Sequence, residues 1–183
     1  ELKKIVEEKW GKFDILVHSL AFADKNDLKN RFSDTSRDGF KMACDISAFS
    51  LIGLCNALKE NFNEEASVMS MTYYGSVKVL KGYNVMGVAK AALEASTRYL
   101  ADDLGPQNIR VNCISAGPIR TLAASGVPGL KDFLKTIEEK APMRKNVTQE
   151  DVAGTAVYLA SHLSRGVTGQ VIYVDSGINI IGH

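Results

Sequence analysis

Residues 66–115 read ASVMSMTYYGSVKVLKGYNVMGVAKAALEASTRYLADDLGPQNIRVNCIS. This stretch opens with an apolar run at residues 66–72 and closes with another at residues 109–115, and both runs are typical of buried parallel strands. Between them, residues 84–104 are rich in Ala and Leu and end at a Gly-Pro pair, which predicts a long helix. A strand, a helix and a second strand in this order predict two parallel strands joined by a crossover helix.

The same alternation continues in both directions along the chain. The further predicted elements are a helix at residues 2–10, a strand at 13–17 (FDILV), a long helix at 35–62, short helices across 118–140, a helix from a capping box at Thr148–Asp151 to about Leu163, and a strand at 169–175. The sequence therefore predicts one α/β domain over residues 1–183, built as a Rossmann-like, doubly wound parallel sheet with helices on both faces.

One part of this fold is missing from the pattern. A dinucleotide-binding sheet of this kind begins with a strand, a Gly-rich turn and a helix whose N-terminus holds the pyrophosphate. No G-x-G-x-x-G turn follows a strand here, and residues 13–17 have the composition of an inner strand that lacks a neighbour on one side. We therefore expect about three further strands to precede this sequence, which would make residues 1–183 the C-terminal two-thirds of the domain.

The composition is that of an ordinary soluble globular protein. There are 22 Lys and Arg residues against 21 Asp and Glu, a net charge of +1, which argues against bulk binding to nucleic acid or to an anionic membrane. No apolar stretch approaches the roughly 20 residues needed to span a bilayer, and the first ten residues do not resemble a signal peptide. The three cysteines indicate a reducing compartment, and the three scattered histidines predict no metal site. We expect a cytoplasmic protein.

Tyr83 and Lys90 are the candidate chemical pair. They lie seven residues apart, about two helical turns, so both side chains leave the same face of the predicted helix. A Lys ammonium beside a phenol lowers the pKa of the phenol, which makes the Tyr a better donor to an oxygen that gains negative charge. An amphipathic helix that happens to begin with Tyr has the same spacing. Tyr74 and Lys78 match Tyr-x-x-x-Lys by letter, but they follow a strand directly, where no helix aligns them.

The residues of this motif favour the interpretation of Tyr83 and Lys90 as a catalytic pair. YNVMGVAKAALEASTRYLADDLG at residues 83–105 closely resembles the active-site helix of bacterial enoyl-acyl-carrier-protein reductases, a divergent branch of the short-chain dehydrogenase/reductase superfamily. The resemblance extends to VHSLAFA at 17–23, DIS at 45–47, IRVNCISAGPIRTLAASG at 109–126 and GQVIYVDSG at 169–177. Ordinary members of the superfamily have Tyr four residues before the Lys, where this sequence has Met86, and Tyr73 stands in place of their Ser. This double shift is typical of the enoyl reductases.

The resemblance implies an activity and the residues for it. It implies hydride transfer from NADH to C3 of trans-2-enoyl thioesters that are carried by acyl carrier protein in type II fatty-acid synthesis. Tyr83 would hydrogen-bond the thioester carbonyl, whose oxygen gains charge as an enolate, and Lys90 would bind the nicotinamide ribose hydroxyls. Tyr73 would line the pocket as a third catalytic residue, and Ala23 would contact the substrate. NADPH is not excluded, because the residue that selects the cofactor follows a strand that is absent from this sequence.

Two segments are implied to contact the cofactor. They are Ser19, Leu20 and Ala21 after the first strand, and Ile119, Arg120, Thr121, Leu122 and Ala123 after the third. Residues 118–140 would form a substrate-binding lid, and Lys131 and Lys135 match the basic surface that an acidic carrier protein requires. The family assembles as a homotetramer, which implies subunit contacts through residues 84–104 and the tail at 176–183.

Two other functions compete with this one. A carbonyl-reducing dehydrogenase of the same fold would have Tyr at the position of Met86. A truncated, inactive scaffold would keep the sheet and the lid but would not hold a dinucleotide, which the missing Gly-rich turn favours.

Overall fold

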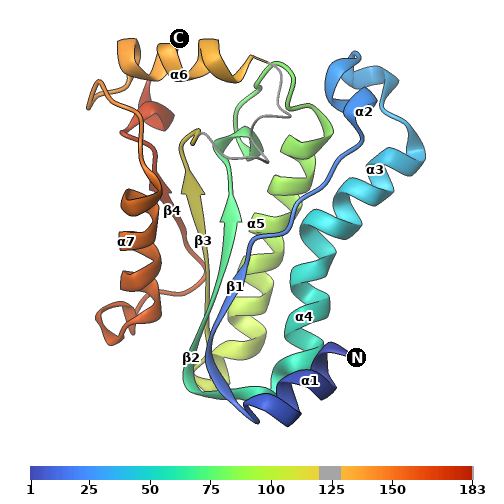
Figure 1. The fold of residues 1–183 in the computed structure, drawn as a ribbon, viewed down its shortest axis with the longest axis vertical. Coiled ribbons are helices and arrows are strands. Elements are labelled where there is room, and N and C mark those ends of the chain that lie inside the picture. Colours follow the sequence, from blue (N-terminus) through green and yellow to red (C-terminus); the bar gives the residue numbers. More distant parts are fainter. Residues whose placement is uncertain (120–128, 183) are drawn as a thin grey trace.

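The computed structural model describes residues 1–119 and 129–182 and contains a parallel sheet in the order β1-β2-β3-β4 (Figure 1). The strands are β1 (Phe13–His18), β2 (Phe62–Thr72), β3 (Arg110–Ala116) and β4 (Val171–Val174). The helices are α1 (Leu2–Lys9), α2 (Lys25–Lys29), α3 (Arg37–Cys44), α4 (Ser50–Leu58), α5 (Val85–Leu104), α6 (Leu130–Lys140) and α7 (Gln149–Ala160).

Helices cover both faces of this sheet. Figure 1 shows α4 and α5 on one face and α7 on the other. Neighbouring strand residues alternate between the two sides, because successive side chains of a strand point to opposite faces. Val68 and Cys113 pack in the cluster formed with α4 and α5, whereas Met69 and Ile114 pack with Leu159 of α7. The predicted doubly wound parallel α/β fold is therefore confirmed.

Several element boundaries differ from the predicted ones. β2 begins at Phe62 rather than at residue 66, and β4 covers only Val171–Val174. The helix predicted at 35–62 consists of α3, a π-helical turn at Asp45–Phe49, and α4. In the part of 118–140 that the structure describes, one helix of 11 residues, α6, replaces the predicted short helices.

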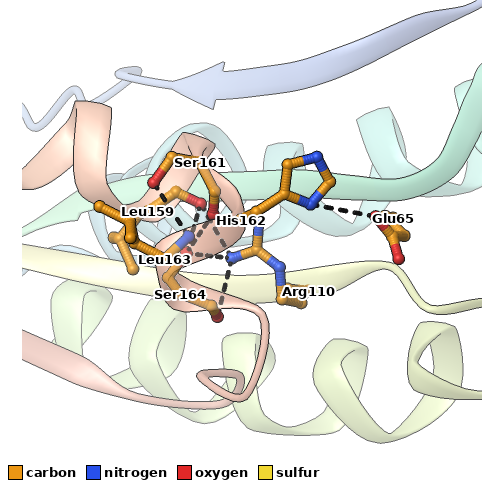
Figure 2. Close-up of polar contacts among 7 residues, drawn as sticks. All are labelled: Glu65, Arg110, Leu159, Ser161, His162, Leu163 and Ser164. Carbon is orange, nitrogen blue, oxygen red and sulfur yellow. Dashed lines mark hydrogen bonds and ion pairs between the residues drawn. The ribbon is translucent and has the colours of Figure 1, made fainter.

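α7 is fixed at both ends by polar contacts. At its start the predicted capping box is present, with the Asp151 amide donating to the Thr148 hydroxyl at 3.2 Å and the Thr148 amide donating to Asp151 at 2.8 Å. Past its end, the buried Arg110 guanidinium donates to the carbonyl oxygen of Leu159 at 2.8 Å and to the hydroxyl of Ser164 at 2.7 Å (Figure 2). α7 ends at Ala160 rather than near residue 163, and a 3-10 turn at His162–Ser164 follows it.

β1 lies at an edge of the sheet and exposes apolar side chains. Its residues Ile15 and Val17 are 48% and 55% exposed, so the face of β1 that they occupy is not covered by the described residues.

One helical run corrects an expectation about membrane spans. Residues Arg37–Asn61, from α3 to the turn after α4, are long and apolar enough to cross a membrane by length and composition alone. Helices in the core of a soluble protein also meet this criterion of length and composition. Ala43, Leu51 and Cys55 of this run are buried inside the protein. A single run of this kind is weak grounds for a membrane assignment.

Candidate active site

The candidate site lies at the carboxyl ends of the strands, where doubly wound folds bind their ligands. His18 is the last residue of β1, Tyr73 directly follows β2, and Gly117 directly follows β3. The amino-terminal half of α5 runs beside these strand ends and carries Lys90, with Tyr83 just before its first turn (Figure 1). The structure therefore brings together the three residues predicted to be catalytic.

Lys90 is a buried cation at the centre of the site. Its side chain is only 6% exposed, and its ammonium donates to the carbonyl oxygen of Met71 at 2.7 Å. Burial lowers the pKa of Lys90 to about 8, although the nearby Cys113 and Glu94 act in the opposite direction. An ammonium has three N–H donors, so Lys90 can donate to further oxygens besides Met71. This donor set fits the adjacent hydroxyls of a nicotinamide ribose.

Tyr73 and Tyr83 form an aromatic pair. Their ring centroids are 5.1 Å apart and their planes meet at 74°. Burial raises the pKa of both phenols above the ordinary value of 10, with Glu94 adding to the effect on Tyr83. The expectation of a lowered Tyr83 pKa is therefore wrong, because burial and Glu94 both disfavour the phenolate. Both hydroxyls stay protonated at neutral pH and act as hydrogen-bond donors.

Two glycines allow the turn after β2 to lie directly against α5. A Cβ atom on Gly87 would lie 2.7 Å from the carbonyl oxygen of Gly75, and a Cβ atom on Gly75 would lie 2.5 Å from the Tyr83 ring. Side chains at these positions would push the Tyr73 turn away from α5. Tyr74 and Lys78, which match Tyr-x-x-x-Lys by letter, do not share a helix. Tyr74 lies on a 3-10 turn that ends at Ser76, before Lys78.

The predicted cofactor turn after β1 is held at both ends by side chains. His18 is 1% exposed, and its Nδ1 and Nε2 atoms lie 2.8 Å from the hydroxyls of Ser70 and Ser50. At the other end, the amide of Phe22 donates to the Ser47 hydroxyl at 3.0 Å. Between these anchors, residues 19–21 are exposed at the strand end, and Ala23 packs in the same cluster as Tyr83.

Asn84 is a structural residue of the site that the sequence reasoning missed. It has a φ of 40° and a ψ of −118° at the start of α5, a positive-φ conformation that L-residues rarely adopt. Its side-chain amide donates to the carbonyl oxygens of Leu28 at 3.0 Å and Asn30 at 2.8 Å, which fixes the α2 segment against the active-site helix. His18 and Ser47 were also not predicted as anchors, although both lie in motifs that carried the resemblance.

The segment after β3 is described only in part. Gly117 and Pro118 are buried and Ile119 is half-buried, next to the end of β3. Arg120, Thr121, Leu122 and Ala123, predicted to contact the cofactor, lie outside the described residues.

α6 follows this segment and exposes both of the predicted docking lysines. Lys131 and Lys135 are exposed, whereas Leu134 between them is buried. The Lys135 ammonium lies 3.8 Å from the Glu139 carboxylate on the same helix. On the inner side of α6, the Phe133 ring stacks on Tyr74 with centroids 6.1 Å apart. α6 is therefore joined to the turn that carries Tyr73.

The fold and the Tyr83–Lys90 helix beside the strand ends define an oxidoreductase of the short-chain dehydrogenase/reductase class. A family model described as enoyl-(acyl carrier protein) reductase matches residues 1–179. The chain belongs to the enoyl-acyl-carrier-protein reductase family.

Individual relatives agree with this assignment. An enoyl-acyl-carrier-protein reductase (NADH) from Nostoc sp. is 56% identical over 177 residues, which are 97% of this chain and 69% of the relative. The enzyme of the same name from Rickettsia felis is 54% identical, over 97% of this chain and 68% of its own length. This chain thus spans about two-thirds of the length of these relatives.

Solved structures show the same fold. The Bacillus cereus reductase, crystallised with NADP+ and indole naphthyridinone, superposes with a TM-score of 0.97 at 52% identity and covers all of this chain and 71% of its own. The Anaplasma phagocytophilum reductase, crystallised with NAD, gives a TM-score of 0.93 at 43% identity, with 100% of this chain and 67% of that one covered.

Proposed function

We propose that this chain carries the catalytic residues of an NADH-dependent enoyl-acyl-carrier-protein reductase that saturates trans-2-enoyl thioesters in fatty-acid synthesis. The observation that carries this proposal is the buried Lys90 ammonium, bonded to Met71 two residues before Tyr73, together with the contact between the Tyr73 and Tyr83 rings. In the proposed domain, residues 1–183 form one Rossmann-like unit, and residues 118–140 form its substrate lid.

Tyr83 is proposed to donate a hydrogen bond to the thioester carbonyl oxygen. When NADH is bound, it supplies the hydride that is delivered to C3 of the substrate. The carbonyl oxygen then gains negative charge, and a donor aimed at that oxygen stabilises the transition state. The raised pKa of Tyr83 keeps its proton in place for this purpose. Tyr73, edge to face with Tyr83, would hold that ring and line the acyl pocket together with Ala23.

Lys90 is proposed to hold the cofactor rather than to transfer the proton. Its ammonium would donate to the ribose hydroxyls, while Ser19, Leu20 and Ala21 would lie along the cofactor from the end of β1. Ile119 is proposed to contact the nicotinamide, and residues 120–123 are proposed to continue that contact toward the diphosphate. NADH is the cofactor in the names of the Nostoc and Rickettsia relatives.

The presence of Met86 argues against the alternative function as a carbonyl-reducing dehydrogenase. That reaction requires a Tyr hydroxyl four residues before the Lys, and Met86 offers no such donor. Its side chain is buried in an apolar cluster with Ala43, Val85 and Ala89. A titration with NADH distinguishes the inactive scaffold, which would not bind it.

The proposal extends to partners and assembly. Lys131 and Lys135 on α6 would contact the acidic carrier protein. A homotetramer would bury side chains such as Tyr99 on α5 and Ile180 in the tail, which are 80% and 73% exposed in the single chain. We also propose a cytoplasmic location, without nucleic-acid or membrane partners.

The test is the loss of NADH absorbance in the presence of a trans-2-enoyl thioester. Oxidation that depends on the thioester, and that is faster with NADH than with NADPH, would support the proposal. NADH binding without turnover of any enoyl thioester, or reduction of a ketone substrate instead, would contradict it. Size measurement in solution tests the tetramer separately.

A further inference from the structure

Glu94 is a buried carboxylate on the same face of α5 as Lys90. It follows Lys90 by four residues, one helical turn, and is also only 6% exposed. Its Oε1 atom accepts a hydrogen bond from the Thr72 hydroxyl at 2.7 Å, and Thr72 directly precedes Tyr73. Glu is almost never buried to this extent without a compensating partner. One hydroxyl is a small compensation for a buried negative charge, so a further partner is needed.

The surroundings of Lys90 identify that partner. Two titratable groups act on Lys90, Cys113 from β3 and Glu94 from α5 itself, and Lys90 in turn acts on His18 of β1. Burial lowers the pKa of His18 to about 4 and raises the pKa of Cys113 to about 11, so both are neutral at pH 7.

The remaining nearby groups do not supply a negative charge. The phenols of Tyr73 and Tyr83 are neutral, because burial raises their pKa values. Arg98, a further turn along α5, is exposed and positive. Tyr173 of β4 is a further phenol whose pKa is raised by burial. Asp175 is another buried carboxylate, but it acts on the tyrosines of this region and not on Lys90. Among the described residues, Glu94 is therefore the carboxylate that acts on the Lys90 ammonium.

We propose that Glu94 is a positioning residue that keeps the buried Lys90 protonated. Burial disfavours the ammonium, and an anion fixed one turn away opposes that effect. The Lys90 ammonium itself donates to Met71 and stays free to donate to ligand oxygens. The inference rests on the proposed function, in which a cationic Lys90 binds the cofactor hydroxyls.

The test compares Glu94→Gln with Thr72→Val in the intact protein. The Gln side chain keeps an oxygen that accepts from Thr72 but has no charge, whereas Val removes the Thr72 donor and leaves the carboxylate in place. For each variant, kcat/KM for NADH is measured against pH with a trans-2-enoyl thioester. Glu94→Gln is expected to lower the pH at which activity falls on the alkaline side by about one unit. Thr72→Val is expected to leave that midpoint within a few tenths of a unit of wild type.

The outcomes separate the possible failures. An unchanged alkaline midpoint in Glu94→Gln overturns the inference, and so does an equal shift in Thr72→Val, because the hydrogen bond rather than the charge would then matter. A wild-type protein without enoyl-dependent NADH oxidation contradicts the proposed function instead. Thermal melting checks that each variant folds, and Glu94→Ala, which also lacks the charge, gives the same expected shift if the Gln variant does not fold.

Discussion

The Tyr73 and Tyr83 rings meet nearly edge to face, with their centroids 5.1 Å apart, although one follows a strand and the other precedes a helix. Edge-to-face contact is a favoured geometry for aromatic pairs, because the positive ring edge meets the negative ring face. The contact orients both phenols at the carboxyl end of β2. It also means that whatever displaces the turn after β2 moves the Tyr83 ring.

Removal of the Tyr83 hydroxyl tests its role as donor. Tyr83→Phe keeps the ring and its contact with Tyr73 but removes the hydrogen bond to the developing negative charge. We expect kcat with an enoyl thioester to fall by about 10²-fold, since the loss of one such donor costs about that much. The dissociation constant for NADH is expected to stay the same, as measured by fluorescence titration.

The matched control for this substitution is Tyr74→Phe. Tyr74 is buried and stacks on Phe133, and its hydroxyl has no proposed part in the reaction. Steady-state kinetics should therefore give a kcat close to that of wild type. A loss in Tyr74→Phe as large as in Tyr83→Phe would mean that the aromatic cluster, and not the Tyr83 hydroxyl, limits the rate.

Gly87 tests the close approach of the turn to α5. An added Cβ atom would lie 2.7 Å from the Gly75 carbonyl oxygen, a backbone atom that moves only with its whole turn. Gly87→Ala is therefore expected to lower the free energy of unfolding by about 1–3 kcal/mol, as overpacking does. It is also expected to reduce activity, because the turn carries Tyr73. Denaturant unfolding and kinetics measure the two effects.

Gly154 on α7 provides the opposite case. It lies in a helix, and no atom is within 4 Å of an added Cβ. Gly154→Ala is expected to raise the free energy of unfolding by about 0.5–1 kcal/mol, because Ala has less backbone entropy to lose. If both substitutions changed stability in the same direction, helix propensity rather than the Gly75 contact would dominate at Gly87.

The parts of the fold that could be predicted were those encoded by local pattern. The apolar runs at residues 66–72 and 109–115 have the composition of strands buried on both faces, and the Thr148–Asp151 capping box is contained in four residues. The first four residues of β2 could not be predicted, because FNEE contains mostly polar residues and only Phe62 among them pairs with β1 before the register shifts.

The site was predicted to the extent that one helix defines it. The spacing of Tyr83 and Lys90 follows from helical geometry, but the direction of the Tyr83 pKa shift depends on burial by other elements. The bonds from His18 to Ser50 and Ser70, and from Asn84 to Leu28 and Asn30, join segments that are far apart in sequence. No local pattern predicts contacts of that kind.

His18 predicts a pH dependence of stability. Burial, aided by the charge of Lys90, lowers the pKa of His18 from 6.5 to about 4. Between these pH values the unfolded chain binds a proton that the folded chain does not. The stabilising contribution of neutral His18 is therefore fully present above about pH 6.5 and is lost as the pH falls toward 4, by about 3 kcal/mol.

His18→Gln should abolish this part of the pH dependence, which urea unfolding at several pH values would reveal. His162→Gln is the control, since His162 is exposed and its ion pair with Glu65 lies at the surface (Figure 2). Exposed ion pairs contribute less than about 1 kcal/mol. An equal effect of both substitutions would contradict the assignment of the acid dependence to the buried residue.

Lys90 predicts opposite pH trends for activity and for stability. Its pKa is lowered by burial from 10.5 to about 8, so the cation that binds the cofactor is lost as the pH rises through about 8. Activity should fall over that range. Between about pH 8 and 10.5 the unfolded chain keeps a proton on this Lys that the folded chain has released, so the Lys90 contribution to the free energy of unfolding rises with pH.

Lys90→Met isolates both effects. The substitution is expected to reduce kcat/KM for NADH by about 10²-fold or more, because it removes the charged donor. The rise in the free energy of unfolding between about pH 8 and 10.5 is expected to be absent from this variant, because Met carries no proton to release. Lys135→Met, on exposed α6, should change neither quantity when the substrate is a small thioester. A Lys90→Met protein that keeps the wild-type rise in the free energy of unfolding above pH 8 would mean that Lys90 does not carry this pH dependence.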